Sequence, residues 1–377
     1  MMPPHLTTRW LSLLTFLVLF LIVCDILWIV HKEYIFEREL NSLFITTDDF
    51  TAAVGPSYKQ ALFDAGRDSF NFDFSAAHHS NNTIPQLMHY IWYDNLYPPP
   101  PSSRKRTIPS IAPELCVKHN PGFTIKIWNE ADVLQLLHSN YPWFLPTYSN
   151  YAEPVQRVDA AKYFILLEHG GIYADHDVSC RKGLYPLLDF AAWFPRASPL
   201  GVNNDLMAAR KGHPLMKKMV ARLDDRNKWL VFPWLTIFWS TGPRFTTDVL
   251  HEYLVEQRAV RKSHAEDNIV EGSVRVVKPD SVSVLPASMY SEELQFFGHT
   301  PGGTWYRWDV ALVLWIGGHW YLLMIFVLVV VVSVWMVATR RSRSRLFRIL
   351  SSVRRRSSGY MNRKDDDESS VRLLEVV

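Results

Sequence analysis

The sequence has 377 residues and 48% of them are hydrophobic, which is enough for one large domain with a substantial core. Its formal net charge is only +3, and much of the basic excess lies in the C-terminal tail. This charge balance excludes an extended basic surface along the middle of the chain, so we expect no nucleic-acid partner.

Residues 10–30 form a first apolar run and predict a membrane anchor. The run is about as long as a bilayer-spanning helix and lacks the small-residue cleavage site of a signal peptide. Residues 309–338 hold a membrane-proximal segment and a second apolar run, which stops at a block of arginines. Such a block marks the cytosolic side, so we predict that residues 339–377 are a cytosolic tail. Two transmembrane helices then place residues 1–9 in the cytosol and the intervening chain in the lumen of the secretory pathway.

Residues 31–83 predict a lumenal stem that leads to the edge of a domain. Asn81 lies in an Asn-X-Thr triplet, a glycosylation acceptor sequence that suits a lumenal surface loop. Cys116 and Cys180 would share the oxidising lumen, where a disulfide between them and two free thiols are both open.

Residues 84–308 carry the pattern of an α/β domain. Residues 84–92 mix β-branched and aromatic side chains and predict a first strand, and residues 121–129 alternate apolar and polar positions and predict a second. A helix is expected from Pro154 to Gly170, because apolar residues recur there at three- and four-residue steps. The strand that follows runs directly into two aspartates. In α/β domains, ligands gather at the carboxyl ends of such strands.

Asp175 and Asp177 are those two aspartates. In extended backbone, residues two apart point to the same side, so the two carboxylates would face together while His176 turns away. Two oxygen ligands, with open positions for phosphate oxygens, suit a hard cation such as Mn²⁺ or Mg²⁺. The alternative for so short a motif is a pair of ordinary turn residues.

Residues 228–239 form a strongly aromatic run that contains a proline and is too short to span a membrane. The burial preferences of such side chains favour a place in the core. The alternative is a patch at the membrane interface, where aromatic side chains lie against lipid headgroups.

The stretch from Arg157 to Val178, RVDAAKYFILLEHGGIYADHDV, resembles the DXD-containing, GT-A-type glycosyltransferases related to the fungal initiating α-1,6-mannosyltransferases. The resemblance extends from about residue 84 to Trp305, with IPQLMHYIW, FTIKIWN, NNDLMAARKGHPLM and STGP in the expected order. Within this family, the chain looks most like the branch that mannosylates inositol phosphorylceramide. The resemblance implies a Rossmann-like GT-A domain between the two transmembrane helices.

The resemblance also implies roles for residues around the two aspartates. Asp175 and Asp177 would hold the metal ion and the diphosphate of a nucleotide sugar, and Asp159 would contact the sugar or ribose. Arg157 and Lys162 would help to bind the donor. Lys162 stands where the family usually has arginine, so it keeps the charge but lacks the bidentate fork. The alternative is that Arg157, Asp159 and Lys162 form a solvated helix face.

Later segments would complete the site. Asn203, Asn204 and Asp205 are implied to contact the transferred sugar or the acceptor, although capping or turn formation would explain them equally well. His299 and Trp305 match the family's late histidine and tryptophan, which places His299 beside the metal and Trp305 among the catalytic residues. The alternative for His299 is a structural role next to a turn.

The implied activity is the metal-dependent transfer of mannose from GDP-mannose to inositol phosphorylceramide in the Golgi membrane, with retention of configuration. A regulatory membrane subunit is implied by the same resemblance. The second apolar run begins shortly after Trp305, which would hold the site close to a bilayer and suits a lipid acceptor. Two alternatives remain: a Golgi transferase that acts on protein-linked glycans or uses another nucleotide sugar, and a non-catalytic membrane subunit with the same fold. The intact pair Asp175 and Asp177 favours an enzyme.

Overall fold

The computed structural model describes residues 4–46, 49, 83–94, 110–198, 200–264, 278–290, 296–299 and 308–319, and isolated positions between 321 and 340. Asn81 and Trp305 lie outside the described residues. The chain divides into two compact units, which are described separately. One unit consists of residues 1–32 and 311–377, and the other of residues 33–310.

The terminal unit contains the first part of helix α1 (Pro4–Ser42) and most of helix α12 (Trp308–Gly318). In the described part of the chain, no helix combines the length and the apolarity needed to cross a membrane. The two transmembrane helices expected at residues 10–30 and within 309–338 gain no support from this finding and stay predictions.

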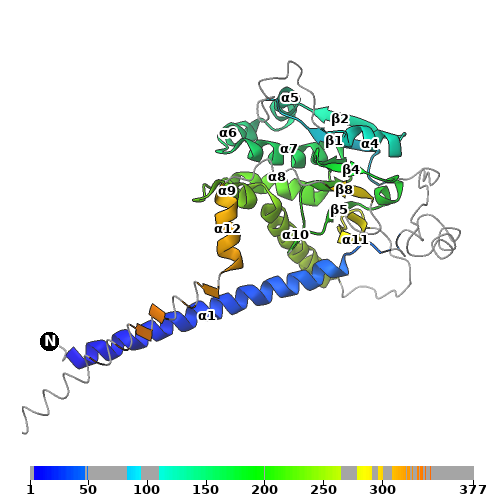
Figure 1. The fold of residues 1–377 in the computed structure, drawn as a ribbon. Helices are drawn as coiled ribbons and strands as arrows, with labels where there is room; N and C mark the ends of the chain where they lie inside the picture. Colours follow the sequence, from blue (N-terminus) through cyan, green and yellow to red (C-terminus); the bar gives the residue numbers. More distant parts are fainter. Residues whose placement is uncertain are drawn as a thin grey trace, which may run out of the picture. The chain divides into compact units, whose positions relative to one another are not determined.

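Within the described residues, six strands form a mixed sheet at the centre of the unit 33–310 (Figure 1). Their order is β2 (Thr124–Trp128), β1 (Leu87–Ile91), β3 (Gly171–Ala174), β6 (Leu206–Ala209), β5 (Ala192–Pro195) and β7 (Ser283–Leu285). β2, β1 and β3 are parallel, β6 is antiparallel to both neighbours, and β7 is parallel to β5. A separate two-stranded sheet pairs β4 (Val178–Cys180) with β8 (Phe297–His299). The mixed α/β class and the strands expected within residues 84–92 and 121–129 are confirmed.

The described residues of the unit 33–310 also form helices. They are α4 (Ala112–His119), α5 (Glu130–Asn140), α6 (Leu145–Ser149), α7 (Pro154–His169), α8 (Pro214–Arg226), α9 (Pro233–Ser240), α10 (Pro243–His264) and α11 (Ala287–Tyr290), with 3-10 turns at Pro142–Phe144 and Tyr185–Asp189. The helix expected to begin at Pro154 and to be capped by Gly170 is confirmed as α7.

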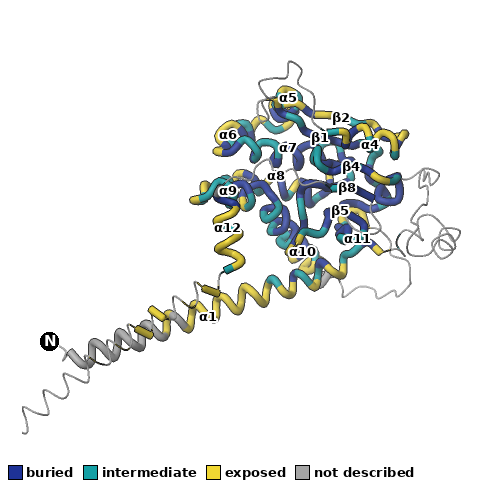
Figure 2. Tube along the Cα trace, viewed as in Figure 1, coloured by how far each residue is buried: buried dark blue, intermediate teal, exposed yellow. Residues whose placement is uncertain are grey.

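Successive residues of β3 and β6 alternate between two buried hydrophobic clusters. Figure 2 shows that buried residues gather at the centre of the domain. Tyr173 and Met207 belong to the cluster that includes α7, α8 and α10, whereas Ile172 and Ala208 belong to the cluster that includes α4. Because side chains alternate across a strand, the two clusters lie on opposite faces of the sheet. Burial on both faces explains why β3 and β6 are short, wholly apolar runs without a polar alternation.

The last turns of α1 belong to the same core. Phe36 and Leu40 are buried in the larger hydrophobic cluster. On the helix surface, Glu33 pairs with Arg244, Glu37 with Arg196 and Glu39 with Arg258. The chain that precedes residue 84 therefore contributes a helix to the domain core, in addition to any stem.

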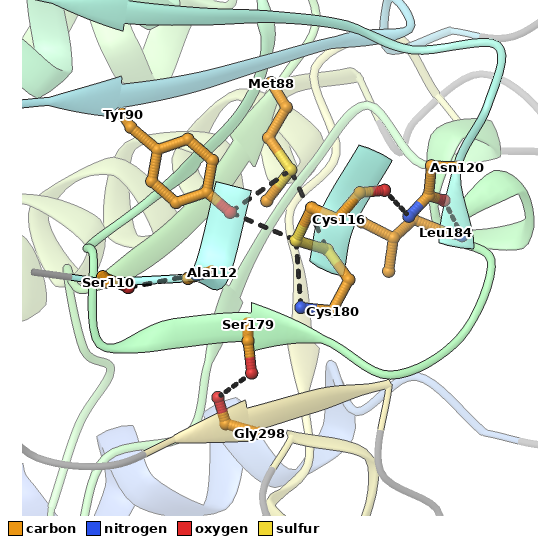
Figure 3. The surroundings of a disulfide bond; sticks show 10 residues. All are labelled: Met88, Tyr90, Ser110, Ala112, Cys116, Asn120, Ser179, Cys180, Leu184 and Gly298. Atoms are coloured by element: carbon orange, nitrogen blue, oxygen red, sulfur yellow. Dashed lines mark hydrogen bonds between the residues drawn. A yellow bond between two sulfur atoms is a disulfide. The ribbon is translucent and has the colours of Figure 1, made fainter. Parts of the chain in front are cut away.

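A disulfide joins Cys116 of α4 to Cys180 of β4, with the two Cα atoms 4.6 Å apart (Figure 3). Asn120 fixes the same corner, since its side chain accepts a hydrogen bond from the Leu184 backbone amide at 2.7 Å. Ser179 of β4 donates to the Gly298 carbonyl of β8 at 3.3 Å. These contacts decide the alternative that the sequence left open, and they hold the strand that directly follows the two aspartates.

The aromatic run at residues 228–239 is only partly in the core. Thr236, Ile237 and Ser240 of α9 are buried, as expected for a core segment. Trp229, Val231 and Trp239 are exposed, with relative accessibilities of 60%, 80% and 39%. The preference for a core location is therefore wrong for this face of the run.

Candidate active site

Helix α7 carries Asp159 and Lys162 to the sheet. It begins at Pro154, and a capping box in which Glu153 and Gln156 exchange backbone contacts secures its first turn. Asp159 and Lys162 are one helical turn apart, so both side chains leave the same face. That face is buried, and the alternative of a solvated helix face is wrong for these two residues.

Two glycines make the connection from α7 to β3. Gly170 has φ of +67° and Gly171 has φ of +98°, which are conformations that other residues rarely adopt. A Cβ on Gly171 would lie 2.6 Å from the Leu87 carbonyl oxygen of β1. The glycines therefore let β3 lie directly against β1 and fix where the strand ends.

Asp175 follows the last residue of β3. Its amide donates to the Asp205 carbonyl at 2.7 Å, because β6 is antiparallel to β3 and Asp205 immediately precedes β6. The turn from Asp175 to Asp177 closes when Val178 donates its amide to the Asp175 carbonyl at 2.9 Å. Asp175, Asp177 and Asp205 therefore lie at the same end of the β3–β6 pair, although Asp205 is distant from the other two in sequence.

Lys162 lies between two carboxylates. Its Nζ is 2.9 Å from Asp159 Oδ1 and 3.0 Å from Asp175 Oδ1. Burial alone would lower the pKa of Lys162, but the charges of Asp159 and Asp175 raise it well above its ordinary value. The ammonium group is therefore permanently charged and orients both carboxylates. The Tyr173 hydroxyl adds a hydrogen bond to Asp175 Oδ1 at 2.6 Å.

His299 lies between the other two acids. Its Nε2 is 3.7 Å from Asp177 Oδ2 and 3.6 Å from Asp205 Oδ2. Burial would lower the pKa of His299, but its hydrogen bond to Asp177 and the nearby carboxylates raise it. The Tyr290 hydroxyl donates to Asp205 Oδ2 at 2.6 Å. Burial raises the pKa of the Asp205 carboxyl to about 6, against the opposing effect of the Tyr290 hydrogen bond.

The Asn204 side chain connects α7 to Thr241, the residue that follows α9. Its side-chain amide donates to Asp159 Oδ1 at 3.2 Å and to the Thr241 carbonyl at 3.4 Å. Thr241 donates its hydroxyl to Asp159 Oδ2 at 3.3 Å. The neighbouring Asn203 instead accepts a hydrogen bond from the Asn204 amide at 3.0 Å, which is the turn-forming contact that the sequence left as an alternative.

Arg157 is not in this cluster. Among the described residues, the ion-pair partner of Arg157 is Glu130 of α5, at 3.7 Å between Nε and Oε1. Trp305 lies outside the described residues. His176 turns away from the two aspartates, as expected, and its ring contacts those of Tyr90 and Trp92.

Three residues of the cluster were not anticipated. Tyr173 is two residues from Asp175, so the strand period that paired the aspartates could also have indicated it. Thr241 falls in the STGP segment, whose order supported the resemblance but whose side chains carried no assigned role. Tyr290 precedes a gap in the described chain, and no local pattern points to it.

The acidic groups fit a hard cation only in part. Within the described residues, no three His, Cys, Asp or Glu side chains form a metal site by themselves. Asp205 Oδ1 is buried and has no hydrogen-bond partner in the described part of the chain. A buried carboxylate oxygen without a partner next to Asp177 and His299 is suited to an ion that takes its other ligands from a substrate. Of the predicted metal ligands, Asp177 and His299 lie together, whereas Asp175 is engaged by Lys162 and Tyr173.

Comparison with known families agrees with this geometry. Residues 111–194, which include α7, β3 and both aspartates, match the family described as "Glycosyltransferase sugar-binding region containing DXD motif". The match covers the segment that holds the DXD motif and does not extend to the rest of the chain. The resemblance found in the sequence is thereby confirmed for the DXD region.

Relatives of the DXD region point to one branch of the family. Mannosyl phosphorylinositol ceramide synthase SUR1 of Saccharomyces cerevisiae is 33% identical over 198 residues, which cover 52% of this chain and 47% of the relative. Inositol phosphoceramide mannosyltransferase 3 of Schizosaccharomyces pombe is 29% identical over 238 residues, which cover 63% and 60%. Mannosyl phosphorylinositol ceramide synthase CSH1 of Saccharomyces cerevisiae is 29% identical over 281 residues, which cover 74% and 68%. The chain spans about half the length of the first of these relatives.

Proposed function

We propose that this protein is a metal-dependent mannosyltransferase that transfers mannose from GDP-mannose to inositol phosphorylceramide with retention of configuration. The observation that carries the proposal is the convergence of Asp159, Lys162, Asp175, Asp177, Asp205 and His299 at the carboxyl end of β3. The names of the relatives supply the sugar and the acceptor. The mixed sheet, with its acids at the end of a parallel strand, supports the finer assignment to the GT-A type.

Asp177 and Asp205 would hold a Mn²⁺ or Mg²⁺ ion, with Asp175 next to them. When bound, such an ion neutralises the negative charge of a nucleoside diphosphate as it leaves. Lys162 fixes the Asp175 carboxylate through its own charge, and Tyr173 fixes it through a hydrogen bond. Asp159, buried and held by Asn204 and Thr241, presents a hydrogen-bond acceptor to the hydroxyl groups of a sugar. These groups are oriented before the substrate arrives, which is where such sites gain most of their rate.

The setting of the reaction is part of the proposal. A lipid acceptor, a Golgi location with a lumenal catalytic domain, two transmembrane helices and a regulatory membrane subunit all follow from the sequence and from the branch of the family. The Cys116–Cys180 disulfide supports an oxidising compartment, because such bonds are rare in the cytosol.

The test is a transfer assay with the purified full chain in detergent. We expect radiolabelled mannose to pass from GDP-mannose to inositol phosphorylceramide, activity to be lost with a chelator, and Mn²⁺ or Mg²⁺ to restore it. Asp177→Asn should lower turnover by about 10²-fold or more, because an ion ligand is lost. Asp225→Asn, at a position where the side chain is 72% exposed, is the matched control and should leave turnover unchanged.

The other outcomes identify the alternatives. Transfer from a UDP-sugar in preference to GDP-mannose would overturn the donor, and transfer to protein-linked glycans would overturn the acceptor. A folded chain that binds no GDP in the presence of Mn²⁺, by calorimetry, and turns over no donor would identify a non-catalytic subunit.

A further inference from the structure

The segment around α9 exposes several large apolar side chains on the unit 33–310. We call them the α9 surface, which is defined by exposed Trp229, Val231 and Trp239. Trp234 and Phe238 are half-buried beside them, and their rings stack with centroids 4.8 Å apart. Soluble proteins seldom gather large apolar side chains in one exposed place without a partner.

The α9 surface is held rigidly from beneath. Thr236 is buried, and its hydroxyl bonds to the amide and the carbonyl of Leu230, at 3.0 Å and 2.9 Å. At the other end of the helix, the buried Ser240 hydroxyl accepts a hydrogen bond from Gln156 of α7 at 2.7 Å. The exposed side chains therefore belong to a fixed element, which is what a docking surface requires.

The same helix ends at the candidate active site. Thr241 is the C-cap of α9, and its hydroxyl bonds to Asp159 at 3.3 Å. Since α9 has eight residues, its axis is about 12 Å long at 1.5 Å per residue. Any body that rests on the α9 surface would thus lie within roughly one short helix length of the groups proposed to hold the sugar.

The start of α9 is hydrogen-bonded to Asp309, which begins the segment expected to lead to the second transmembrane helix. The Trp234 amide donates to Asp309 Oδ2 at 2.7 Å, and Asp309 is fully buried. The segment at residues 309–338, which the sequence predicts to contain a membrane-proximal part and a transmembrane helix, begins at this same residue. The chain that leads to this predicted helix therefore leaves the unit 33–310 beside the first turn of α9.

We propose that the α9 surface docks on the lipid bilayer and thereby presents the candidate active site to an acceptor embedded in it. Tryptophan and other amphipathic aromatic side chains concentrate at the membrane–water interface, and this surface offers two exposed tryptophans. An exposed lysine, Lys228, precedes them, as is common for segments that lie at headgroup level. The inference rests on the proposed function for the lipid nature of the acceptor, but the docking itself can be measured without catalysis.

The first experiment measures docking. The full chain carrying Cys24→Ser and Val231→Cys is labelled with an environment-sensitive fluorophore and reconstituted into phosphatidylcholine vesicles that contain nitroxide-labelled lipid. Cys24→Ser with Trp143→Cys is the control, because Trp143 is exposed to 54% on a different element. We expect a blue-shifted emission and severalfold stronger quenching by the nitroxide lipid at position 231 than at position 143. Equal quenching at the two positions would overturn the proposal. A label at position 231 that is shielded from aqueous iodide but not quenched by the nitroxide lipid would also overturn it, because a protein partner would then cover the surface.

The second experiment measures the consequence for catalysis. In Trp229→Ser/Val231→Ser/Trp239→Ser, the KM for acceptor lipid in vesicles should rise by about tenfold, whereas hydrolysis of the donor without acceptor should not change. Trp143→Ser/Val255→Ser removes exposed apolar side chains elsewhere and should behave as the unaltered chain. An unchanged KM in the triple variant, together with wild-type transfer, would refute the docking role and leave the proposed function intact. Lipid quenching at position 231 in a chain that mannosylates no lipid would support the docking and refute the proposed function.

Discussion

Lys162 is the residue on which the charge balance of the site depends. Its ammonium group neutralises Asp159, and both side chains are almost completely buried. We predict that Lys162→Met lowers the free energy of unfolding by about 3 kcal/mol, because it leaves a buried carboxylate without a counter-ion. Denaturant unfolding of the unit in detergent would measure the change.

The matched variant for this prediction is Asp159→Asn/Lys162→Met, which removes both charges. We expect it to regain at least half of the lost stability, since Asp175 remains partly solvated with an exposure of 33%. If the double variant is no more stable than Lys162→Met, the loss comes from packing and not from charge.

Burial of the ionised Asp205 carboxylate destabilises the folded protein, and the size of this effect depends on pH. The Asp205 pKa of about 6 in the folded chain lies above the ordinary 3.8, so the folded state binds the proton more tightly than the unfolded state. The cost is therefore absent below about pH 4 and fully present above about pH 6, where it corresponds to about 3 kcal/mol at most. We predict that Asp205→Asn raises the melting temperature of the metal-free protein at pH 7.5 and has no effect at pH 4. A gain of the same size at both values would contradict this origin.

At the scale of residues, the sequence predicted those contacts that a local period determines. Asp175 and Asp177 follow from the two-residue period of a strand, and Asp159 and Lys162 share a face through the three-residue step of a helix. Asp205, His299 and Tyr290 come from three other segments, and no local period relates them to the DXD turn. Asp205 and His299 were available only through the family resemblance, and Tyr290 was not available at all.

At the scale of elements, two glycines with positive φ, Gly171 and Gly212, separate two physical effects. Gly171 and Gly212 both have positive φ, but a Cβ on Gly171 would meet the backbone of β1, whereas one on Gly212 would meet nothing within 4 Å. We predict that Gly212→Ala costs about 1 kcal/mol, from the backbone conformation alone. Gly171→Ala should cost about 2–4 kcal/mol, because β3 must also move away from β1.

The same pair of variants reports on catalysis. A displaced β3 carries Asp175 with it, so Gly171→Ala should also lower turnover under conditions where the protein stays folded. Gly212→Ala should keep normal turnover. Equal losses of stability in the two variants, measured by denaturant unfolding, would refute the role of the close approach.

The elements that the sequence predicted were those with distinct flanks. β1, β2 and α7 are bounded by proline, asparagine or glycine, and all three were expected. β6 and β5 are four-residue apolar runs buried on both faces, which do not differ from short helical segments by period. The antiparallel placement of β6 could not be inferred either, although it is what brings Asp205 to Asp175.

At the scale of the whole molecule, the boundary between the two compact units, at residues 32 and 33, does not coincide with the start of the domain that the composition predicts, at residue 84. The sequence places a stem at residues 31–83 because that segment lacks long apolar runs. The structure adds residues 33–46 to the core through a few well-spaced contacts: Phe36 and Leu40 are buried, and the Ile45 amide donates to the Val284 carbonyl at 2.9 Å. Single apolar residues on one side of a charged helix barely change the composition of a segment, but each can bury a large side chain in the core.

This division predicts where the unit 33–310 can be cut from the rest of the chain. A fragment of residues 33–310 keeps Phe36, Leu40 and the three Glu–Arg pairs, and we expect it to fold and to bind GDP with Mn²⁺. A fragment of residues 46–310 loses three buried core side chains, those of Phe36, Leu40 and Ile45, at about 3 kcal/mol each, which is most of the stability of an ordinary domain. It should aggregate or unfold cooperatively at a much lower temperature. Within the longer fragment, Phe36→Ala/Leu40→Ala should reproduce most of the loss, whereas Tyr34→Ala/Ile35→Ser, at exposed positions of the same helix, should not. Equal stability of the two fragments would show that the end of α1 is only a linker.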